Sequence, residues 1–180
     1  MPYIQKNTNN IFGLQPAEGP QGMTNYYAVS STEGTAILPG DAIIRSSLGA
    51  FVRAAVSADG AQFVGAAADS LSTASFAQGT LNLLVYDDPH QYFAITNTTS
   101  ADMTPAMLGQ NVAIITTATG TGIPSTLVGR SKMALGVAGS SAGVVRIVQM
   151  HPIETWTSSM VGAFKWIVRR NPTEPAVLTT

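Results

Sequence analysis

Residues 81–96 read LNLLVYDDPHQYFAIT, and this stretch indicates the fold more strongly than any other. Two runs of aliphatic and aromatic residues, 81–86 and 92–96, have the length and composition of β-strands. The polar segment between them contains Pro89, which cannot continue a helix or the interior of a strand. The stretch therefore predicts two strands joined by a turn.

Runs of the same kind recur on both sides of this stretch, separated by Gly, Pro, Asp and Ser at the spacing of all-β domains. No segment repeats apolar residues at the helical period over three turns. We therefore predict an all-β protein, folded as a single β-barrel or β-sandwich domain. The strands are expected near Asn25–Val29, Asp41–Arg45, Ala50–Val56, Gln62–Ala67, Leu81–Tyr86, Tyr92–Thr96, Asn111–Thr116, Lys132–Val137, Val144–Gln149 and Phe164–Arg169.

Four local features complete this prediction. Asp59-Gly60 lies between two strand runs and is expected to form a hairpin turn, because both residue types tolerate a positive φ. Ser100–Gly109 is the one candidate for a short helix, with Ser100 as its cap. Ala66–Ala77 and Thr116–Ser125 are small-residue stretches expected to be loops, either solvated or used as contact surface.

The two ends of the chain differ in composition from its middle. Residues 1–24 are expected to form an extended arm, because prolines interrupt them and no strand or helix period is sustained. Phe12 and Leu14 are apolar enough to require a pocket, on this domain or on a neighbouring subunit. The β core domain is expected over residues 25–170, and residues 171–180 form a tail.

Charged residues make up 11% of the chain and the formal net charge is −1, against about 25% charged residues in an ordinary soluble domain. Uncharged polar groups and alanine cost less to desolvate than lysine or glutamate, which suits a surface packed against other protein. The low net charge disfavours nucleic acid and membrane as partners. The absence of cysteine excludes disulfides and thiol chemistry. The start of the chain lacks a signal-peptide pattern, so we expect synthesis in a cytoplasm.

Several segments, in their order along the chain, resemble a family of virion structural proteins of tailed bacteriophages, the head decoration or cement proteins. The resemblance covers about residues 11–150. Gln15 stands where the family usually has Arg, and the chain after His151 departs from the family pattern. The matching segments are FGLQP (12–16), NYY (25–27), LPGDAI (38–43), QFVG (62–65), VYDDPHQYF (85–93), LGQN (108–111) and RIV (146–148).

This resemblance implies a β-barrel or sandwich that sits as a homo-oligomer, a dimer or trimer, on the outer surface of an assembled capsid. Its partners would be the major capsid protein and further copies of itself. A tail or head-fibre adaptor, or a receptor-binding structural module, is the alternative. The major capsid protein itself is disfavoured, because the usual phage coat fold contains a long helix that this sequence does not encode.

Residues 87–90, Asp-Asp-Pro-His, are the densest polar cluster, and their two carboxylates and imidazole are candidate ligands for a divalent cation. Asp87 and Asp88 would point to opposite faces of an extended strand, so a turn that positions backbone is the preferred interpretation. No Gly-x-Ser-x-Gly elbow marks a nucleophile. We therefore predict no enzyme activity and no catalytic, cofactor-binding or metal-binding residue.

The predicted interface combines arm residues, first-strand tyrosines and a cluster near the C-terminus. The aromatic residues of that cluster either anchor a contact or close the bottom of the barrel. Its two arginines either pair with acidic groups on a shell or solvate an edge strand. Deleting residues 1–21 is expected to weaken attachment while the core still folds. The interface candidates are Phe12, Leu14, Tyr26, Tyr27, Trp156, Phe164, Trp166, Arg169 and Arg170.

Overall fold

The computed structural model shows an all-β protein, as predicted, and every expected strand is present. It describes residues 13–17, 23–29, 35–45, 51–53, 62–76, 81–97, 104–115, 131–138, 143–151 and 165–171. The strands are β1 (Gln15–Pro16), β2 (Thr24–Val29), β3 (Ala42–Arg45), β4 (Phe51–Arg53), β5 (Gln62–Ala67), β6 (Leu81–Tyr86), β7 (Tyr92–Thr96), β8 (Asn111–Ile115), β9 (Ala134–Ala138), β10 (Val145–Met150) and β11 (Lys165–Arg170).

The first half of the chain forms a small closed barrel with the strand order β2-β4-β3-β5-β6. β2 lies antiparallel to β6 over six residue pairs, from Thr24 opposite Tyr86 to Val29 opposite Leu81. The barrel closes through a single parallel pair between Val29 and Phe51. Alternate residues of these strands point inward, as the two-residue period of a strand requires. The expectation of a barrel is therefore confirmed for this half.

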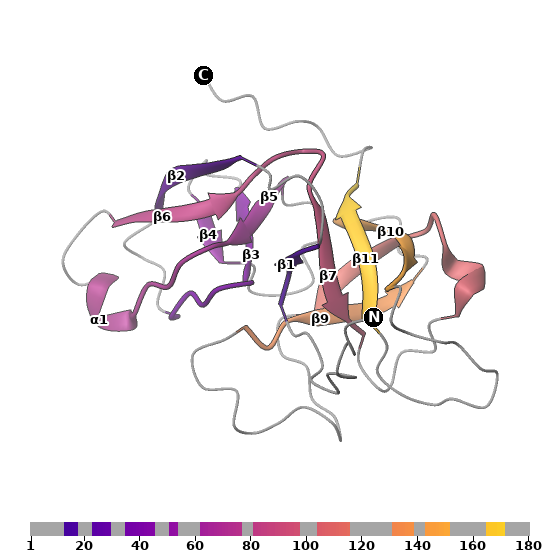
Figure 1. The fold of residues 1–180 in the computed structure, drawn as a ribbon. Coiled ribbons are helices and arrows are strands. Elements are labelled where there is room, and N and C mark those ends of the chain that lie inside the picture. Colours follow the sequence, from indigo (N-terminus) through magenta and orange to yellow (C-terminus); the bar gives the residue numbers. More distant parts are fainter. Residues whose placement is uncertain are drawn as a thin grey trace, which may run out of the picture.

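The second half forms a six-stranded sheet in the order β1-β7-β11-β10-β8-β9. Figure 1 shows this sheet beside the barrel, with β7 and β11 running next to each other. An isolated parallel bridge joins Asn97, directly after β7, to Leu135 in β9. This bridge brings the far edge of the sheet back toward β7, so the sheet curls around its own core. The sequence did not predict this second unit as separate from the barrel.

The two halves share one wall, made of β3 and β5. Ala42 and Phe63 point into the core of the six-stranded sheet, whereas their chain neighbours Ile43 and Val64 point into the barrel. A strand that is covered on both faces reads as a continuous apolar run, which explains the buried residues 63–67. Within this run Gly65 lies so close to β6 that a Cβ would sit 1.9 Å from the Tyr86 carbonyl oxygen. No larger residue fits there.

Part of the predicted N-terminal arm is built into this fold. Gln15 and Pro16 form β1 and pair with β7, and Leu14 is 1% exposed in the core of the six-stranded sheet. Of the two resting places left open for the arm, this segment therefore occupies its own domain. Thr24, expected at the end of the arm, is the first residue of β2.

The local predictions have mixed outcomes. The Ala66–Ala77 loop prediction is wrong at both ends, because Ala66 and Ala67 belong to β5 and Thr73–Phe76 forms the short helix α1. The Ser72 hydroxyl accepts a hydrogen bond from the Ser75 amide and caps this turn.

Within Ser100–Gly109 the structure has a 3₁₀-helix, η1 (Pro105–Met107), preceded by Thr104 at its N-cap position. Ser100 itself and the Thr116–Ser125 stretch lie outside the described residues. None of the helices in the described part of the chain is long and apolar enough to cross a membrane.

The hairpin predicted at Asp59-Gly60 is corrected by the strand order. These two residues lie outside the described part of the chain, but the flanking strands β4 and β5 do not neighbour each other in the barrel. Both pair with β3, one on each side. β4 and β5 therefore lie on opposite sides of β3, which the sequence could not show because pairing order is not encoded in the turn residues alone.

Candidate functional site

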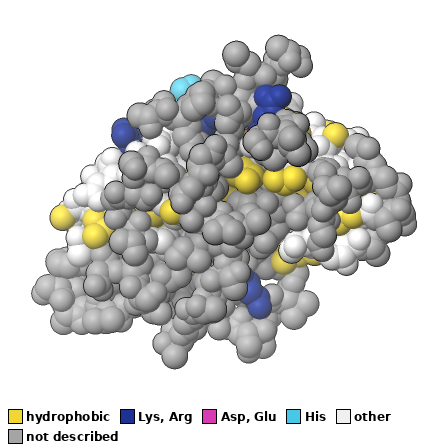
Figure 2. All heavy atoms as spheres, turned by 180° about the vertical axis from the view of Figure 1, so that it is seen from behind, with side chains coloured by type: hydrophobic (Ala, Val, Ile, Leu, Met, Phe, Trp, Pro, Cys, Tyr) yellow, Lys and Arg dark blue, Asp and Glu magenta, His cyan; other side chains and the backbone are white. Residues whose placement is uncertain are grey.

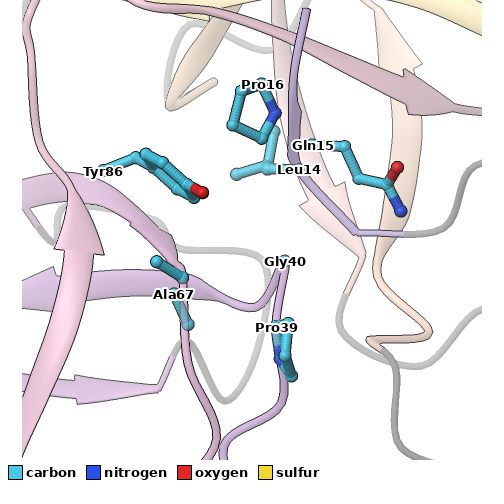
Figure 3. Close-up of a pocket in the computed structure, with 8 residues that line it drawn as sticks. Leu14, Gln15, Pro16, Pro39, Gly40, Ala67 and Tyr86 are labelled. Carbon is cyan, nitrogen blue, oxygen red and sulfur yellow. The ribbon is translucent and has the colours of Figure 1, made fainter. Parts of the chain in front are cut away.

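Three of the segments that carry the family resemblance, 12–16, 38–43 and 85–93, contribute residues to the junction between the two β units. A pocket of about 350 Å³ opens at this junction. Figure 3 shows Tyr86 and Pro16 beside the pocket, while the Gln15 side chain points away from them. Leu14, Gln15, Pro16, Pro39, Gly40, Ala67, Ala68 and Tyr86 line the pocket.

Backbone hydrogen bonds across two glycines fix the shape of this junction. The Leu14 amide donates to the Gly40 carbonyl at 2.8 Å, and the Gly40 amide donates to the Ala67 carbonyl at 2.8 Å. Gly13 and Gly40 have φ angles of +76° and +90°, in the region that disfavours residues with a Cβ. A Cβ on Gly13 would lie 2.9 Å from the Gly40 carbonyl oxygen. The two chain segments thus cross at a distance that only glycine permits.

The pocket lining is polar and apolar in about equal parts, with Leu14 and two prolines beside Gln15 and Tyr86. Among the described residues no cluster of three or more His, Asp or Glu could hold a metal ion. A concave site of this mixed character can accept a side chain of a protein partner or a small ligand.

Asp87, the first residue of the polar cluster, ties the end of β6 to β2. One of its carboxylate oxygens, Oδ2, accepts a hydrogen bond from Asn25 Nδ2 at 2.8 Å and another from the Tyr27 hydroxyl. Burial raises the pKa of Tyr27 far above its usual value of about 10. The hydrogen bond to Asp87 and that residue's negative charge raise it further, against a smaller lowering by Arg170. Tyr27 therefore stays protonated and acts as a donor.

Asp88 and His90 form the turn that the sequence predicted. Asp88 Oδ1 accepts a hydrogen bond from the His90 amide at 2.8 Å, and the Asp88 carbonyl accepts one from the Gln91 amide at 3.0 Å. This is the Asx-type turn in which a carboxylate imitates backbone. The preferred structural interpretation of residues 87–90 is thus confirmed: they carry the chain from the barrel into the six-stranded sheet.

Eight of the nine predicted interface residues fall into three groups, and the exposed Tyr26 stands apart from them. Leu14, Tyr27 and Trp166 have exposed fractions of 1%, 8% and 0% and serve the cores of this chain. The Trp166 indole N–H donates to Asn97 Oδ1 at 3.2 Å, so this tryptophan follows the alternative in which the aromatic residues close the core. Tyr26 is 71% exposed.

Arg169 and Arg170 make up the second group, and both are partly buried at the end of β11. The third group, Phe12, Trp156 and Phe164, lies outside the described residues. Among the described residues, the structure places Leu14 of the arm and Trp166 of the C-terminal cluster in one buried core, whereas the two first-strand tyrosines point to opposite sides of β2.

Sequence reasoning missed three exposed apolar residues. Met23, Tyr92 and Leu108 are 70%, 42% and 47% exposed. Tyr92 begins β7, and the four residues after it are all buried, so no alternation in the sequence marked it as exposed. Figure 2, which shows the back of the molecule, has hydrophobic side chains at the surface in several places, with few charged ones among the described residues.

Comparisons with known proteins identify no relative: no protein-family model, no curated protein and no solved structure matches this chain.

Proposed function

We propose that this protein is a bacteriophage capsid decoration or cement protein, which binds the assembled head shell and stabilises it by bridging neighbouring copies of the major capsid protein. It would be made in the host cytoplasm and reside on the outer surface of the virion. The observation that carries this role is the character of the exposed surface. Met23, Tyr26, Tyr92 and Leu108 are large hydrophobic side chains exposed at the surface, on a chain with 11% charged residues.

The physical mechanism would be linkage. A protein that binds the assembled lattice better than the free coat subunits stabilises the lattice by its binding free energy. No catalytic step is required. Each additional contact by an oligomer raises the effective concentration at the next site, so individually small contacts give long residence times.

The test adds purified protein to undecorated shells assembled from the capsid protein of the same phage and counts bound copies by cryo-electron microscopy. Tyr92→Ser and Leu108→Ser remove exposed apolar area from the six-stranded half. If these residues contact the shell, each variant should bind about tenfold or more weakly, since 1.4 kcal/mol corresponds to a factor of ten. Asn82→Ser, also at an exposed position, is the matched control and should bind like the wild type.

Absence of binding to shells would contradict this role. A few copies per particle at the tail, in place of many on the head, would instead support the alternative role as a tail or head-fibre adaptor. The two outcomes differ in copy number and position, so one imaging experiment separates them.

A further inference from the structure

Within the described part of the chain, one edge of β2 has no strand partner over its N-terminal half. β2 pairs with β6 along its whole length, but with β4 only at Val29. The Met23 carbonyl accepts a hydrogen bond from the Asp87 amide. This contact sets the alternation along β2, so that the peptide groups of Asn25, Tyr27 and Val29 face β6.

The peptide groups of Thr24 and Tyr26 consequently face away from β6. An independent contact agrees: the carbonyl of Leu84, which lies opposite Tyr26, accepts a hydrogen bond from Ala68 on the other side of β6 at 2.8 Å. No backbone partner for Thr24 or Tyr26 on the outer side is found among the described residues. Two N–H donors and two carbonyl acceptors are therefore presented at this edge.

This edge lacks the features that normally block pairing. Edge strands are commonly protected by lysine, by proline or by inward-pointing charge. Residues 23–29 read MTNYYAV and contain none of these. Met23 and Tyr26 are instead the two most exposed large hydrophobic residues of the described chain, at 70% and 71%. An uncharged edge with exposed hydrophobic side chains is typical of a strand that pairs with another strand.

We propose that the β2 edge pairs with the β2 edge of a second copy, antiparallel and about a two-fold axis at Asn25. In this register Thr24 lies opposite Tyr26 of the other copy. The two donors and two acceptors of each edge then meet their complements, which gives four hydrogen bonds. Because residues 23–29 are uncharged, the symmetry brings no like charges together within this strand pair.

A second copy of this chain is the partner that the self-complementary edge favours. Any antiparallel strand would supply the same backbone groups. A second copy also supplies an uncharged strand, and the two-fold pairing covers the exposed Met23 and Tyr26 of both copies in one contact. The pairing deepens the proposed function, on which its biological purpose rests, by naming the contact between copies. Its geometry is tested in solution without a capsid, so its failure and that of the shell-binding role are distinguishable.

The first test uses the natural absence of cysteine. In the proposed register Asn25 faces Asn25 of the other copy as a non-hydrogen-bonded pair, with Cα atoms about 4.5 Å apart. That separation lies within the range of about 4.4–6.8 Å for a disulfide. Asn25→Cys should therefore give a covalent dimer under mild oxidation, seen by non-reducing gel electrophoresis and mass spectrometry.

Ala28→Cys is the matched control on the same strand. It is also exposed, but the register would place the two copies of residue 28 about 20 Å apart, six residues at about 3.3 Å each. Little cross-linking is expected. Equal cross-linking of both variants, or none by Asn25→Cys with its fold intact by circular dichroism, would overturn the register.

The second test exchanges charges. A Thr24→Lys, Tyr26→Lys variant places lysine opposite lysine, and a Thr24→Glu, Tyr26→Glu variant places glutamate opposite glutamate. Each alone should lose the dimer that the wild type forms in sedimentation velocity, and an equal mixture should recover it. Gln149→Lys, at an exposed position in β10, should leave the dimer unchanged.

Two results would refute the pairing. One is a wild-type protein that stays monomeric at every concentration; the other is a mixture of oppositely charged variants that fails to associate. A monomer that still decorates shells would refute this inference alone and leave the proposed function standing.

Discussion

At the scale of single residues, Gly13 and Gly109 separate two destabilising effects of replacing a glycine, backbone strain and steric overlap. Both have a positive φ, at +76° and +80°. A Cβ on Gly109 would meet nothing within 4 Å, whereas one on Gly13 would lie 2.6 Å from the Ser131 Cβ. The pair thus compares backbone strain alone with backbone strain plus overlap.

We expect Gly109→Ala to lower the free energy of unfolding by about 1–2 kcal/mol, the cost of a left-handed backbone with a Cβ. Gly13→Ala should lower it by a further 1–3 kcal/mol or so, because the junction must also open to admit the methyl group. Denaturant unfolding of both variants measures the difference. Equal losses of unfolding free energy would show that the crossing at Gly40 can admit a methyl group without opening.

Tyr27 gives the protein a predictable dependence on alkaline pH. Its pKa is raised in the folded state by burial and by the hydrogen bond to Asp87. The stabilisation is therefore fully present below the unfolded pKa of about 10 and is lost as the pH rises above it. Stability should decline above about pH 10, and less steeply in Tyr27→Phe.

At neutral pH, Tyr27→Phe should itself cost about 1–3 kcal/mol, because the Asp87 carboxylate loses a buried donor. Tyr26→Phe, an exposed position on the same strand, is the control for both effects. A Tyr27→Phe protein with unchanged stability and unchanged pH dependence would show that this hydrogen bond contributes nothing in solution.

At the scale of elements, β1 is the segment whose role changed most between sequence and structure. Leu14 fills the core next to it, so Leu14→Ala should cost about 2–5 kcal/mol by thermal or denaturant unfolding. Met23→Ala, at a 70% exposed position, should stay within about 0.5 kcal/mol of the wild type. A small loss for Leu14→Ala would mean that the segment lies loosely on the surface.

The same observation changes how an arm deletion must be interpreted. Removing residues 1–21 would take away Leu14 and β1 together. Any weaker attachment to a shell would then reflect a damaged core as well as a lost contact. Point substitutions on the exposed surface test shell binding without this ambiguity.

The strands themselves could be predicted from the sequence because each is a short run of β-branched, aromatic or small apolar residues between turn formers. β1 could not, because two residues with a proline show no period. The order of strands could not be predicted either, as β4 and β5 show by pairing on opposite sides of β3. Pairing depends on contacts between distant residues, which local patterns do not encode.

The candidate site was predictable only in part, for a similar reason. The segments around Leu14, Gly40 and Tyr86 stand out along the chain, but their meeting at one pocket is a property of the fold. Conversely, Leu14, Tyr27 and Trp166 were placed at an interface because large apolar side chains suit both cores and contacts. Burial, which decides between the two, follows from the tertiary structure.

At the scale of the whole molecule, the shared wall should make the two β units unfold together. Ala66 belongs to the core of one unit and Ala67 to that of the other. We expect amide protons of β6 in the barrel and of β7 in the sheet to exchange with the same opening free energy, measured by native-state hydrogen exchange. Ile147→Ala, in the sheet core, should lower the opening free energies of β6 and β7 equally.

A barrel that keeps its protection while the sheet loses it would contradict this coupling. Such a result would mean that β3 and β5 remain folded when one of their faces is exposed. The coupling is also the reason that two small units, each with few core residues, can be stable as one.

The sparse charge of the molecule has a consequence for the proposed shell binding. With 9 basic and 10 acidic residues in the whole chain, ion pairs can supply little of the contact. Occupancy on shells should therefore change little between low ionic strength and about 1 M salt, where the Debye length falls to about 3 Å. A steep loss of occupancy with salt would indicate an electrostatic interface.

The path of the backbone between the halves has one more implication. Pro89 and His90 are exposed at the crossover, which makes this turn the natural place to divide the polypeptide. Yet β1, from the N-terminal side of such a cut, is hydrogen-bonded to β7 on the other side. A nick there would leave two interlocked fragments rather than two separable ones, and coexpressed halves would have to assemble by strand donation.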